Sequence, residues 1–245
     1  MYKLAICLPV LNGEKTLEKA IKSILPVLSD KICLIISDNA SNDRTEIIAR
    51  QYMCHSMHIF INVELTTSQF EQNFIRCAEI AHKLGCEFVS YMGHDDCLLP
   101  SYRDFTAWLI GTVAADKVDY IFINSARYTL NEEYIGDVVT LAEGHFAWTK
   151  NYIVEKIGLN VAFTPTLCFS TKYLVGADKT YLGSGWFYLE LIYKTSGHRM
   201  KVYNQVCTRF YEGSTLNMNG KFFELIQSLL AVTSRLDFVD RKSVV

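Results

Sequence analysis

The sequence lacks a surplus of charge of either sign, a long apolar run and any C-x-x-C cysteine pair. Its 24 basic and 26 acidic residues give a formal net charge of -2, so the chain has no electrostatic footprint for nucleic acid. No stretch approaches the roughly 18 to 20 uninterrupted apolar residues of a membrane-spanning helix. The apolar run over residues 4–11 ends in Asn-Gly-Glu without a small-residue cleavage site, which predicts a strand and not a signal peptide.

The eight cysteines are scattered, mostly within apolar stretches. Disulfide frameworks and zinc sites show characteristic cysteine spacings, and none is present in this sequence. Scattered cysteines of this kind are typical of proteins from a reducing compartment. We therefore expect small core residues in a cytoplasmic, soluble protein, with a peripheral position at the inner face of a membrane as the alternative.

Apolar runs typical of buried strands alternate with amphipathic segments along the first hundred residues. Asp43 is expected to cap the second helix and Gly85 to end the third, in which Phe70 and Phe74 share one apolar face. This alternation predicts an α/β fold with a mainly parallel, doubly wound sheet and helices on both faces. Strands are expected over residues 3–10, 31–41, 58–63 and 86–93, and helices over residues 12–25, 44–52 and 70–84.

Polar residues follow three of the predicted strands. Asn12 comes after the first strand, Asp38 after the second, and Asp95 and Asp96 after the fourth. Because ligands of open α/β sheets bind beyond the carboxyl ends of the strands, we expect these side chains at one rim. A dehydrogenase is disfavoured, since the loop after the first strand lacks the G-x-G-x-x-G pyrophosphate turn, and a P-loop is also missing.

Three segments together resemble the nucleotide-binding half of family 2 glycosyltransferases, which are inverting enzymes of the GT-A fold. They are ICLPVLNGEKTLEKAIKSIL, IISDNASNDRTEIIA and FVSYMGHDDCLLP. Each motif is weak alone, but their shared order and spacing are fairly specific, and the resemblance ends near Pro100. It implies a GT-A fold with a nucleotide-sugar-binding half over 1–100, an interlocked acceptor-binding and catalytic half over 101–215, and a C-terminal helix over 216–245.

The resemblance implies that a divalent metal assists the departure of the nucleotide diphosphate from the sugar. Negative charge grows on that leaving group, and Mg²⁺ or Mn²⁺ held by carboxylates stabilises it. Asp96 is expected to hold the metal, with Asp95 near the metal or the ribose. Many relatives carry D-x-D-D where this chain has Gly93-His94-Asp95-Asp96, so the earliest acid is missing. The alternative is that the pair caps the next helix or lies in a solvated turn. His94 is expected in the pocket wall, because imidazole suits Zn²⁺ better than Mg²⁺.

The resemblance also implies a set of donor-binding residues. Asp38 is expected to accept a hydrogen bond from the base, and an acceptor-only group suits a uracil-like or guanine-like N–H; an Asx-turn is the alternative. Pro9 and Asn12 are expected to shape the loop over the base and ribose, or to be plain turn residues. Arg209 lies in CTRFYEGSTLN, which resembles the loop after the last core strand of relatives. Its guanidinium is expected to bind the diphosphate, with a surface ion pair as the alternative.

The acceptor half must supply a general base, because direct displacement needs a carboxylate near the attacking hydroxyl. The segment YLGSGWFYLELIYK is the best candidate, with Glu190 as the expected base. Asp178 is the alternative base. Trp186 and Tyr188 are expected to stack on an acceptor sugar, or else to pack as ordinary helix aromatics.

The sequence therefore predicts a metal-dependent inverting glycosyltransferase that acts on a saccharide acceptor in surface polysaccharide assembly. A lipid-linked acceptor and a peripheral membrane contact would suit the apolar face expected over residues 222–230, although such a face more often covers a core. A nucleotidyltransferase is the alternative enzyme, and the first loop is poor in the glycine and basic residues that it would need. A non-catalytic nucleotide- or sugar-binding relative is the third alternative, and a homo-oligomer is left open.

Overall fold

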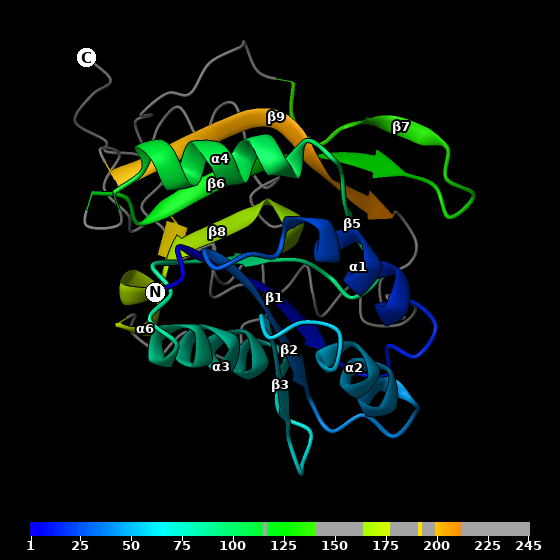
Figure 1. The fold of residues 1–245 in the computed structure, drawn as a ribbon. Coiled ribbons are helices and arrows are strands. Elements are labelled where there is room, and N and C mark those ends of the chain that lie inside the picture. Colours follow the sequence, from blue (N-terminus) through cyan, green and yellow to red (C-terminus); the bar gives the residue numbers. More distant parts are fainter. Residues whose placement is uncertain (115–116, 141–163, 177–190, 193–198, 212–245) are drawn as a thin grey trace, which may run out of the picture.

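A single mixed sheet runs through the chain in the computed structural model, which describes residues 1–114, 117–140, 164–176, 191–192 and 199–211 (Figure 1). In these residues the sheet has nine strands, in the order β3-β2-β1-β4-β8-β6-β9-β5, with β7 paired to β6. The strands are β1 (Leu4–Val10), β2 (Ile32–Asp38), β3 (Ile59–Val63), β4 (Phe88–Tyr91), β5 (Cys97–Leu98), β6 (Tyr120–Tyr128), β7 (Tyr134–Asp137), β8 (Leu167–Ser170) and β9 (Met200–Tyr211).

The first four strands pair in parallel, in the order β3-β2-β1-β4. All seven residues of β1 and all seven of β2 are buried, which explains why their sequences read as continuous apolar runs. The strands and helices expected in this part of the chain are present, but α1 begins at Leu17 and not at residue 12, and β2 ends at Asp38 and not at residue 41. The carboxyl ends of these strands lie on one side of the molecule, at the right in Figure 1.

The second part of the sheet contains antiparallel pairs as well. Strand β8 lies between β4 and β6 and is antiparallel to both, while β6 and β9 pair in parallel. The short strand β5 pairs with β9, so the chain segments before and after Pro100 share one sheet. The predicted α/β class, with a sheet covered by helices, is confirmed.

Helices cover both faces of the sheet (Figure 1). Helices α3 and α6 lie on one face, where Phe74 and Leu174 join the same apolar cluster as Ala5 of β1. Helices α1, α2 and α4 lie on the other, where Leu17 and Phe105 pack with the alternate residues of the strands. The helices are α1 (Leu17–Ile24), α2 (Thr45–Met53), α3 (Phe70–Lys83), α4 (Tyr102–Thr112) and α6 (Thr171–Val175), with short 3₁₀ helices η1 (Leu25–Val27) and η4 (Thr164–Thr166).

Two local signals fix the ends of helices α2 and α3. Asp43 Oδ1 accepts the main-chain N–H of Thr45 at 2.9 Å, so this carboxylate caps the start of α2 as expected. At the end of α3, Gly85 has a φ of 74°. The N–H of Cys86 donates to the carbonyl of Ala81 at 2.9 Å, which completes a Schellman motif that requires the left-handed glycine.

The cysteines are free thiols, and seven of the eight are buried. Only Cys54 is exposed, at the end of α2. The expectation that cysteines serve as small core residues is therefore confirmed for seven of them. Among the described residues, no helix is long and apolar enough to cross a membrane.

Candidate functional site

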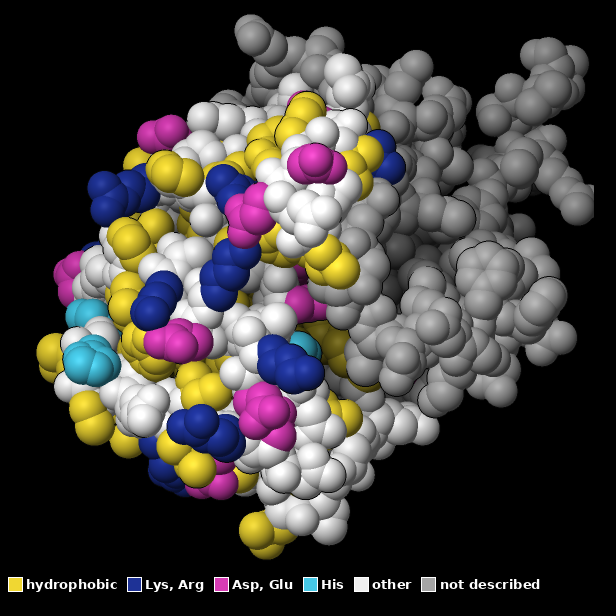
Figure 2. All heavy atoms as spheres, turned by 90° about the vertical axis from the view of Figure 1, so that its right-hand side faces the viewer, with side chains coloured by type: hydrophobic (Ala, Val, Ile, Leu, Met, Phe, Trp, Pro, Cys, Tyr) yellow, Lys and Arg dark blue, Asp and Glu magenta, His cyan; other side chains and the backbone are white. Residues whose placement is uncertain are grey.

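A cavity of about 410 Å³ opens beyond the carboxyl ends of β1, β2 and β4. Its wall contains residues 9–12 at the end of β1 and directly after it, Asn39 after β2 and residues 93–96 after β4, together with Phe210 of β9. Figure 2 looks onto this side of the molecule, where acidic and histidine side chains border a recess and both signs of charge are mixed around it. The structure thus brings Pro9, Asn12, Asp95 and Asp96 to one cavity.

Asp96 is held by main-chain hydrogen bonds from two parts of the chain. Residues 93–96 form a turn in which the N–H of Asp96 donates to the carbonyl of Gly93 at 3.1 Å. Asp96 Oδ2 accepts the N–H of Gly93 at 3.3 Å, and its Oδ1 accepts the N–H of Tyr211 at 3.4 Å. Only 2% of Asp96 is exposed, so neither of the predicted alternatives, a helix cap or a solvated turn acid, describes it.

The surroundings of Asp96 disfavour its negative charge. Burial raises the pKa of the Asp96 carboxyl well above its usual range, and the neighbouring charge of Asp95 raises it further. Two adjacent carboxylates with little access to water are stabilised when a cation binds between them. The electrostatics of the pair therefore favour a bound metal ion.

Gly93 provides the space into which both carboxylates turn. A Cβ added at Gly93 would lie 2.5 Å from Asp95 Oδ1 and 2.8 Å from Asp96 Oδ2, so the two oxygens converge over the glycine. Within the described part of the chain, no group of three His, Cys, Asp or Glu side chains has the geometry to hold a metal. Two carboxylates fit Mg²⁺ or Mn²⁺, which commonly take their remaining ligands from substrate phosphates and water.

His94 lies in the wall of the cavity and faces the loop before α1. Its Nδ1 is 2.8 Å from Thr16 Oγ1, and a Cβ at Gly13 would come within 3.1 Å of the same nitrogen. Burial lowers the pKa of His94 below its usual value, although the charges of Asp95 and Asp43 oppose this shift. A neutral imidazole bound to Thr16 is a wall residue, in agreement with the expectation.

Asp38 is the last residue of β2, and only one of its two carboxylate oxygens has a hydrogen-bond partner among the described residues. Its Oδ1 accepts the N–H of Ser41 at 2.9 Å and the hydroxyl of Ser41 at 2.5 Å, which is the Asx-turn named as the alternative. Its Oδ2 is buried and has no hydrogen-bond partner among the residues that the structure describes. A buried acceptor without a donor is costly, so a ligand N–H would be well matched to Oδ2.

Asn12 joins the loops that follow β1 and β2. It adopts a left-handed conformation with a φ of 54°, which asparagine tolerates better than most residues. Its side-chain oxygen accepts the N–H of Asn42 at 3.0 Å, and its own N–H donates to Ser41 Oγ at 2.8 Å. Asn12 therefore fixes the rim of the cavity through both loops.

Arg209 is placed differently from the prediction. Residues 207–211 belong to strand β9 and not to a loop, because they pair with β5 and β6. Side chains alternate along a strand, and Phe210 lines the cavity, so Arg209 points to the other face of the sheet. There its Nη1 donates to Glu132 Oε2 at 2.8 Å, and its guanidinium lies 4.8 Å from the ring centre of Tyr128.

Several cavity residues were not predicted from the sequence. Ser68 and Asn73 come from the segment that enters α3, and Thr164 and Phe210 come from the second half of the chain. Arg127 of β6 is in register with Phe210, so its side chain lies on the same face of the sheet as the cavity. Asn39, by contrast, directly follows Asp38 at a strand end, which is where the sequence predicts polar residues at the rim.

The acceptor-side candidates lie outside the described residues. These are Glu190, Asp178, Trp186 and Tyr188, together with the predicted C-terminal helix over 216–245. Their assignments stay predictions.

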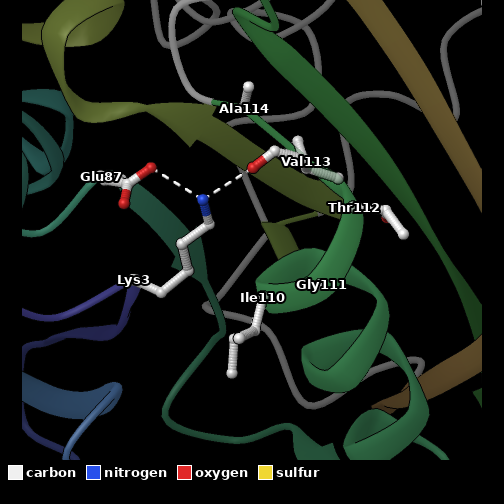
Figure 3. Close-up of a pocket in the computed structure, with 7 residues that line it drawn as sticks. All are labelled: Lys3, Glu87, Ile110, Gly111, Thr112, Val113 and Ala114. Carbon is white, nitrogen blue, oxygen red and sulfur yellow. Dashed lines mark hydrogen bonds and ion pairs between the residues drawn. The ribbon is translucent and has the colours of Figure 1, made fainter.

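A second hollow lies at the amino ends of the strands, beside the end of α4 (Figure 3). In it Lys3 Nζ donates to Glu87 Oε2 at 2.8 Å and to the carbonyl of Val113 at 2.7 Å. The lysine charge is already matched by these acceptors, so this contact ties β1, β4 and α4 together. The cavity at the carboxyl ends is the stronger candidate for a ligand site.

Comparison with protein families identifies one that covers most of the chain. The profile described as glycosyl transferase family 2 matches residues 5–170. A comparison with curated proteins finds no match.

Solved structures of similar fold include residues 1–349 of S. aureus TarS, with a TM-score of 0.67 and 16% identity, over 94% of this chain and 64% of that one. The same TarS fragment in complex with UDP-GlcNAc has a TM-score of 0.67 and 16% identity, and the match covers 94% of this chain and 66% of that one. A third structure is that of glucosyl-3-phosphoglycerate synthase from Mycobacterium tuberculosis, solved with Mn²⁺, UDP-glucose and phosphoglyceric acid. It has a TM-score of 0.55 and 15% identity, and the match covers 94% of this chain and 79% of that one. The chain thus spans less than two thirds of the TarS fragment. The family profile shows that the chain belongs to glycosyl transferase family 2, and the likenesses to solved structures show that it has the GT-A fold.

Proposed function

We propose that the protein transfers a sugar, with inversion, from a nucleotide diphosphate-sugar to a saccharide acceptor, and that the nucleotide is uridine diphosphate. The observation that carries this proposal is the convergence of the Asp95 and Asp96 carboxylates on a cavity whose rim is formed by the Asp38 and Asn12 loops. The solved TarS and mycobacterial structures of similar fold contain UDP-sugars, which supports uridine as the base.

The donor would lie along the carboxyl ends of the strands. Asp38 Oδ2 would accept the N–H of the base, because it is the buried acceptor without a described donor. Asn12, in the loop after β1, and Pro9, which belongs to β1 itself and not to the predicted loop, would border the base and ribose. In this arrangement the diphosphate would lie toward Asp95 and Asp96, which line the same cavity.

The residues Asp95 and Asp96 would hold Mg²⁺ or Mn²⁺, whose charge stabilises a leaving diphosphate. Asp96 would bind the ion from the position in which the N–H groups of Gly93 and Tyr211 already hold its carboxylate. The diphosphate role predicted for Arg209 would require the guanidinium to leave Glu132 and to reach the cavity from the other face of the sheet.

On the acceptor side, Glu190 would take the proton from the acceptor hydroxyl, with Asp178 as the alternative base. The hydroxyl oxygen would bond to the anomeric carbon while the bond from that carbon to the diphosphate oxygen breaks, so that the sugar inverts and the nucleoside diphosphate leaves. Trp186 and Tyr188 would stack on the acceptor sugar. A surface-polysaccharide intermediate, carried on a lipid at the cytoplasmic face of a membrane, is the acceptor that we propose.

The proposal is tested by calorimetric titration of UDP, GDP, CDP, dTDP and ADP with and without Mn²⁺. Wild type should bind UDP more tightly with Mn²⁺ than without it, and Asp96→Asn should lose this enhancement. Asp30→Asn is the matched control, because it removes a carboxylate from an exposed turn outside the cavity. Failure of wild type to bind any of the five nucleotides would refute the proposal, whereas binding without sugar transfer would indicate a non-catalytic relative.

A further inference from the structure

Phe70 is an exposed aromatic residue in the wall of the cavity. It is the first residue of α3, and 46% of it is exposed, although the sequence periodicity places it on the same apolar face as Phe74. Phe74, one turn later, is only 1% exposed. The apolar face of the helix therefore extends past the protein core and into the cavity, where a flat ring remains available to a ligand.

The ring of Phe70 rests on a fixed aromatic base. Its centroid lies 4.5 Å from that of Phe74, and Phe74 stacks on Tyr91 with centroids 4.3 Å apart. The hydroxyl of Tyr91 donates to the carbonyl of Phe74 at 2.8 Å, which ties α3 to β4 beneath the site. A ring already held in this way loses little conformational freedom when a ligand stacks on it.

Two hydrogen-bonded amides connect Phe70 to the end of β2, where Asp38 lies. Asn39 Nδ2 donates to the carbonyl of Ser68 at 2.8 Å, and Asn39 Oδ1 accepts the N–H of Ser68 at 2.9 Å. From the other side, Asn73 Oδ1 accepts the hydroxyl of Ser37 at 2.6 Å, and Asn73 Nδ2 donates to the carbonyl of Ser37 at 2.9 Å. Bonds on both sides of Phe70 in the sequence thus hold it near the end of β2, the strand that Asp38 closes.

The hydrogen bonds of Asn39 and Asn73 also determine which polar groups near Phe70 are left to bind a ligand. The amide groups of Asn39 and Asn73 are occupied within the protein, whereas Asp38 Oδ2 is a buried acceptor with no partner among the described residues. The wall therefore presents a flat apolar surface at Phe70, and the strand end that borders it carries one hydrogen-bond acceptor without a described partner. A planar heterocycle with an N–H on its edge matches both features, as in uracil, thymine or guanine.

We infer that Phe70 is the platform on which the base of the donor nucleotide stacks, with Asp38 reading the N–H edge of the same base. This inference rests on the proposed function. Every base has a π-face, so stacking supplies affinity, and the acceptor supplies the selection against cytosine, whose ring nitrogen at that position carries no proton. Phe70 is accordingly a binding and positioning residue.

The test compares Phe70→Leu and Phe70→Tyr with wild type by calorimetry, using UDP with and without Mn²⁺ and inorganic pyrophosphate with Mn²⁺. Phe70→Leu should weaken UDP binding by about fivefold or more, by a similar factor with and without metal, while pyrophosphate binding stays unchanged. Phe70→Tyr should keep the affinity of wild type, because the ring is retained. Tyr134→Leu is the matched control, since Tyr134 is an exposed aromatic on β7, outside the cavity wall.

The outcomes separate this inference from the proposed function. If wild type binds UDP and Phe70→Leu binds it equally well, the inference is overturned and the proposed function stands. Equal weakening of UDP and pyrophosphate by Phe70→Leu would reveal a general disturbance of the site and would also overturn it. Failure of wild type to bind UDP would overturn both.

Discussion

The main-chain N–H of Tyr211 donates to Asp96 Oδ1 at 3.4 Å and so joins the end of β9 to the acid that follows β4. The side chain of Tyr211 extends to the other face of the sheet, where its hydroxyl accepts from Lys19 Nζ at 3.0 Å and lies 3.3 Å from Glu132 Oε1. Glu132 also binds Lys19 and Arg209, and it stands in the β6–β7 hairpin. One residue of β9 thus links the candidate metal site to a cluster of charges.

Replacing Glu132 by Gln should raise the affinity for UDP by about two- to fivefold. The change removes the anion shared by Lys19 and Arg209, so the potential near Asp96 becomes more positive. The free energy of unfolding should change by less than about 1 kcal/mol, because Glu132 is a half-exposed surface partner. Glu133→Gln is the control, since it makes the same charge change at an exposed neighbour. Equal affinities in calorimetry for Glu132→Gln and Glu133→Gln would contradict the expected change in the potential near Asp96.

Binding of Mn²⁺ with UDP should release a proton at mildly acidic pH. Burial raises the pKa of Asp96 above its ordinary value of 3.8, so the carboxyl is protonated at a higher pH than an exposed aspartate. A metal ion requires the ionised form, and its affinity should fall as the pH drops toward that raised pKa. Calorimetry in two buffers of different ionisation enthalpy, from pH 8 to pH 5, measures the proton count. A metal-dependent affinity that is flat over this range, without proton release, would be the contrary result.

Gly93→Ala should lower the Mn²⁺-dependent affinity for UDP by about tenfold or more while the protein stays folded. The added Cβ would lie within 3 Å of an oxygen of Asp95 and of Asp96, so at least one carboxylate must move away. Gly111→Ala is the control, because its Cβ meets nothing within 4 Å, and in helix α4 it should add about 0.5 to 1 kcal/mol of stability. Urea unfolding and UDP titration of both variants provide the measurement. An unchanged metal dependence in Gly93→Ala would show that the two acids do not act together.

His94→Gln should make stability less sensitive to acid. Burial lowers the pKa of His94 in the folded state below its ordinary value of 6.5, so the unfolded chain takes up the proton first. The contribution of the neutral ring is fully present above pH 6.5 and is lost as the pH falls from 6.5 toward the folded pKa. Urea unfolding at pH 7.5 and 5.5 should therefore show a larger loss for wild type than for His94→Gln. His55→Gln, at an exposed position, should behave as wild type does, and a loss in His94→Gln as large as in wild type would count against the assignment.

The first half of the fold was predictable because its strands and helix ends are each marked by residues within the element itself. Buried strands such as β1 are continuous apolar runs, and the rule that ligands bind beyond strand ends is enough to group Asn12, Asp38 and Asp96 from the sequence alone. Asp43 and Gly85 marked helix ends through the chemistry of their own side chain or backbone.

The rest depends on pairings between distant residues. The pairing of Cys97 with Arg209, which makes residues 207–211 a strand, joins positions 112 apart in the chain, and no local pattern encodes it. Phe210 reaches the cavity from the same strand, where it pairs with Arg127 of β6, 83 positions earlier in the chain. Phe70 shows another limit of periodicity, since the apolar face of α3 was predicted but the point at which it leaves the core was not.

The position of β8 between β4 and β6 has a consequence for synthesis. When the first hundred residues emerge from the ribosome, β4 has a partner on one side only, because residues 167–170 do not yet exist. Its other edge presents unpaired N–H and C=O groups to any extended chain nearby. The nascent first hundred residues therefore carry an open, aggregation-prone edge until the later part of the chain is translated and β8 inserts.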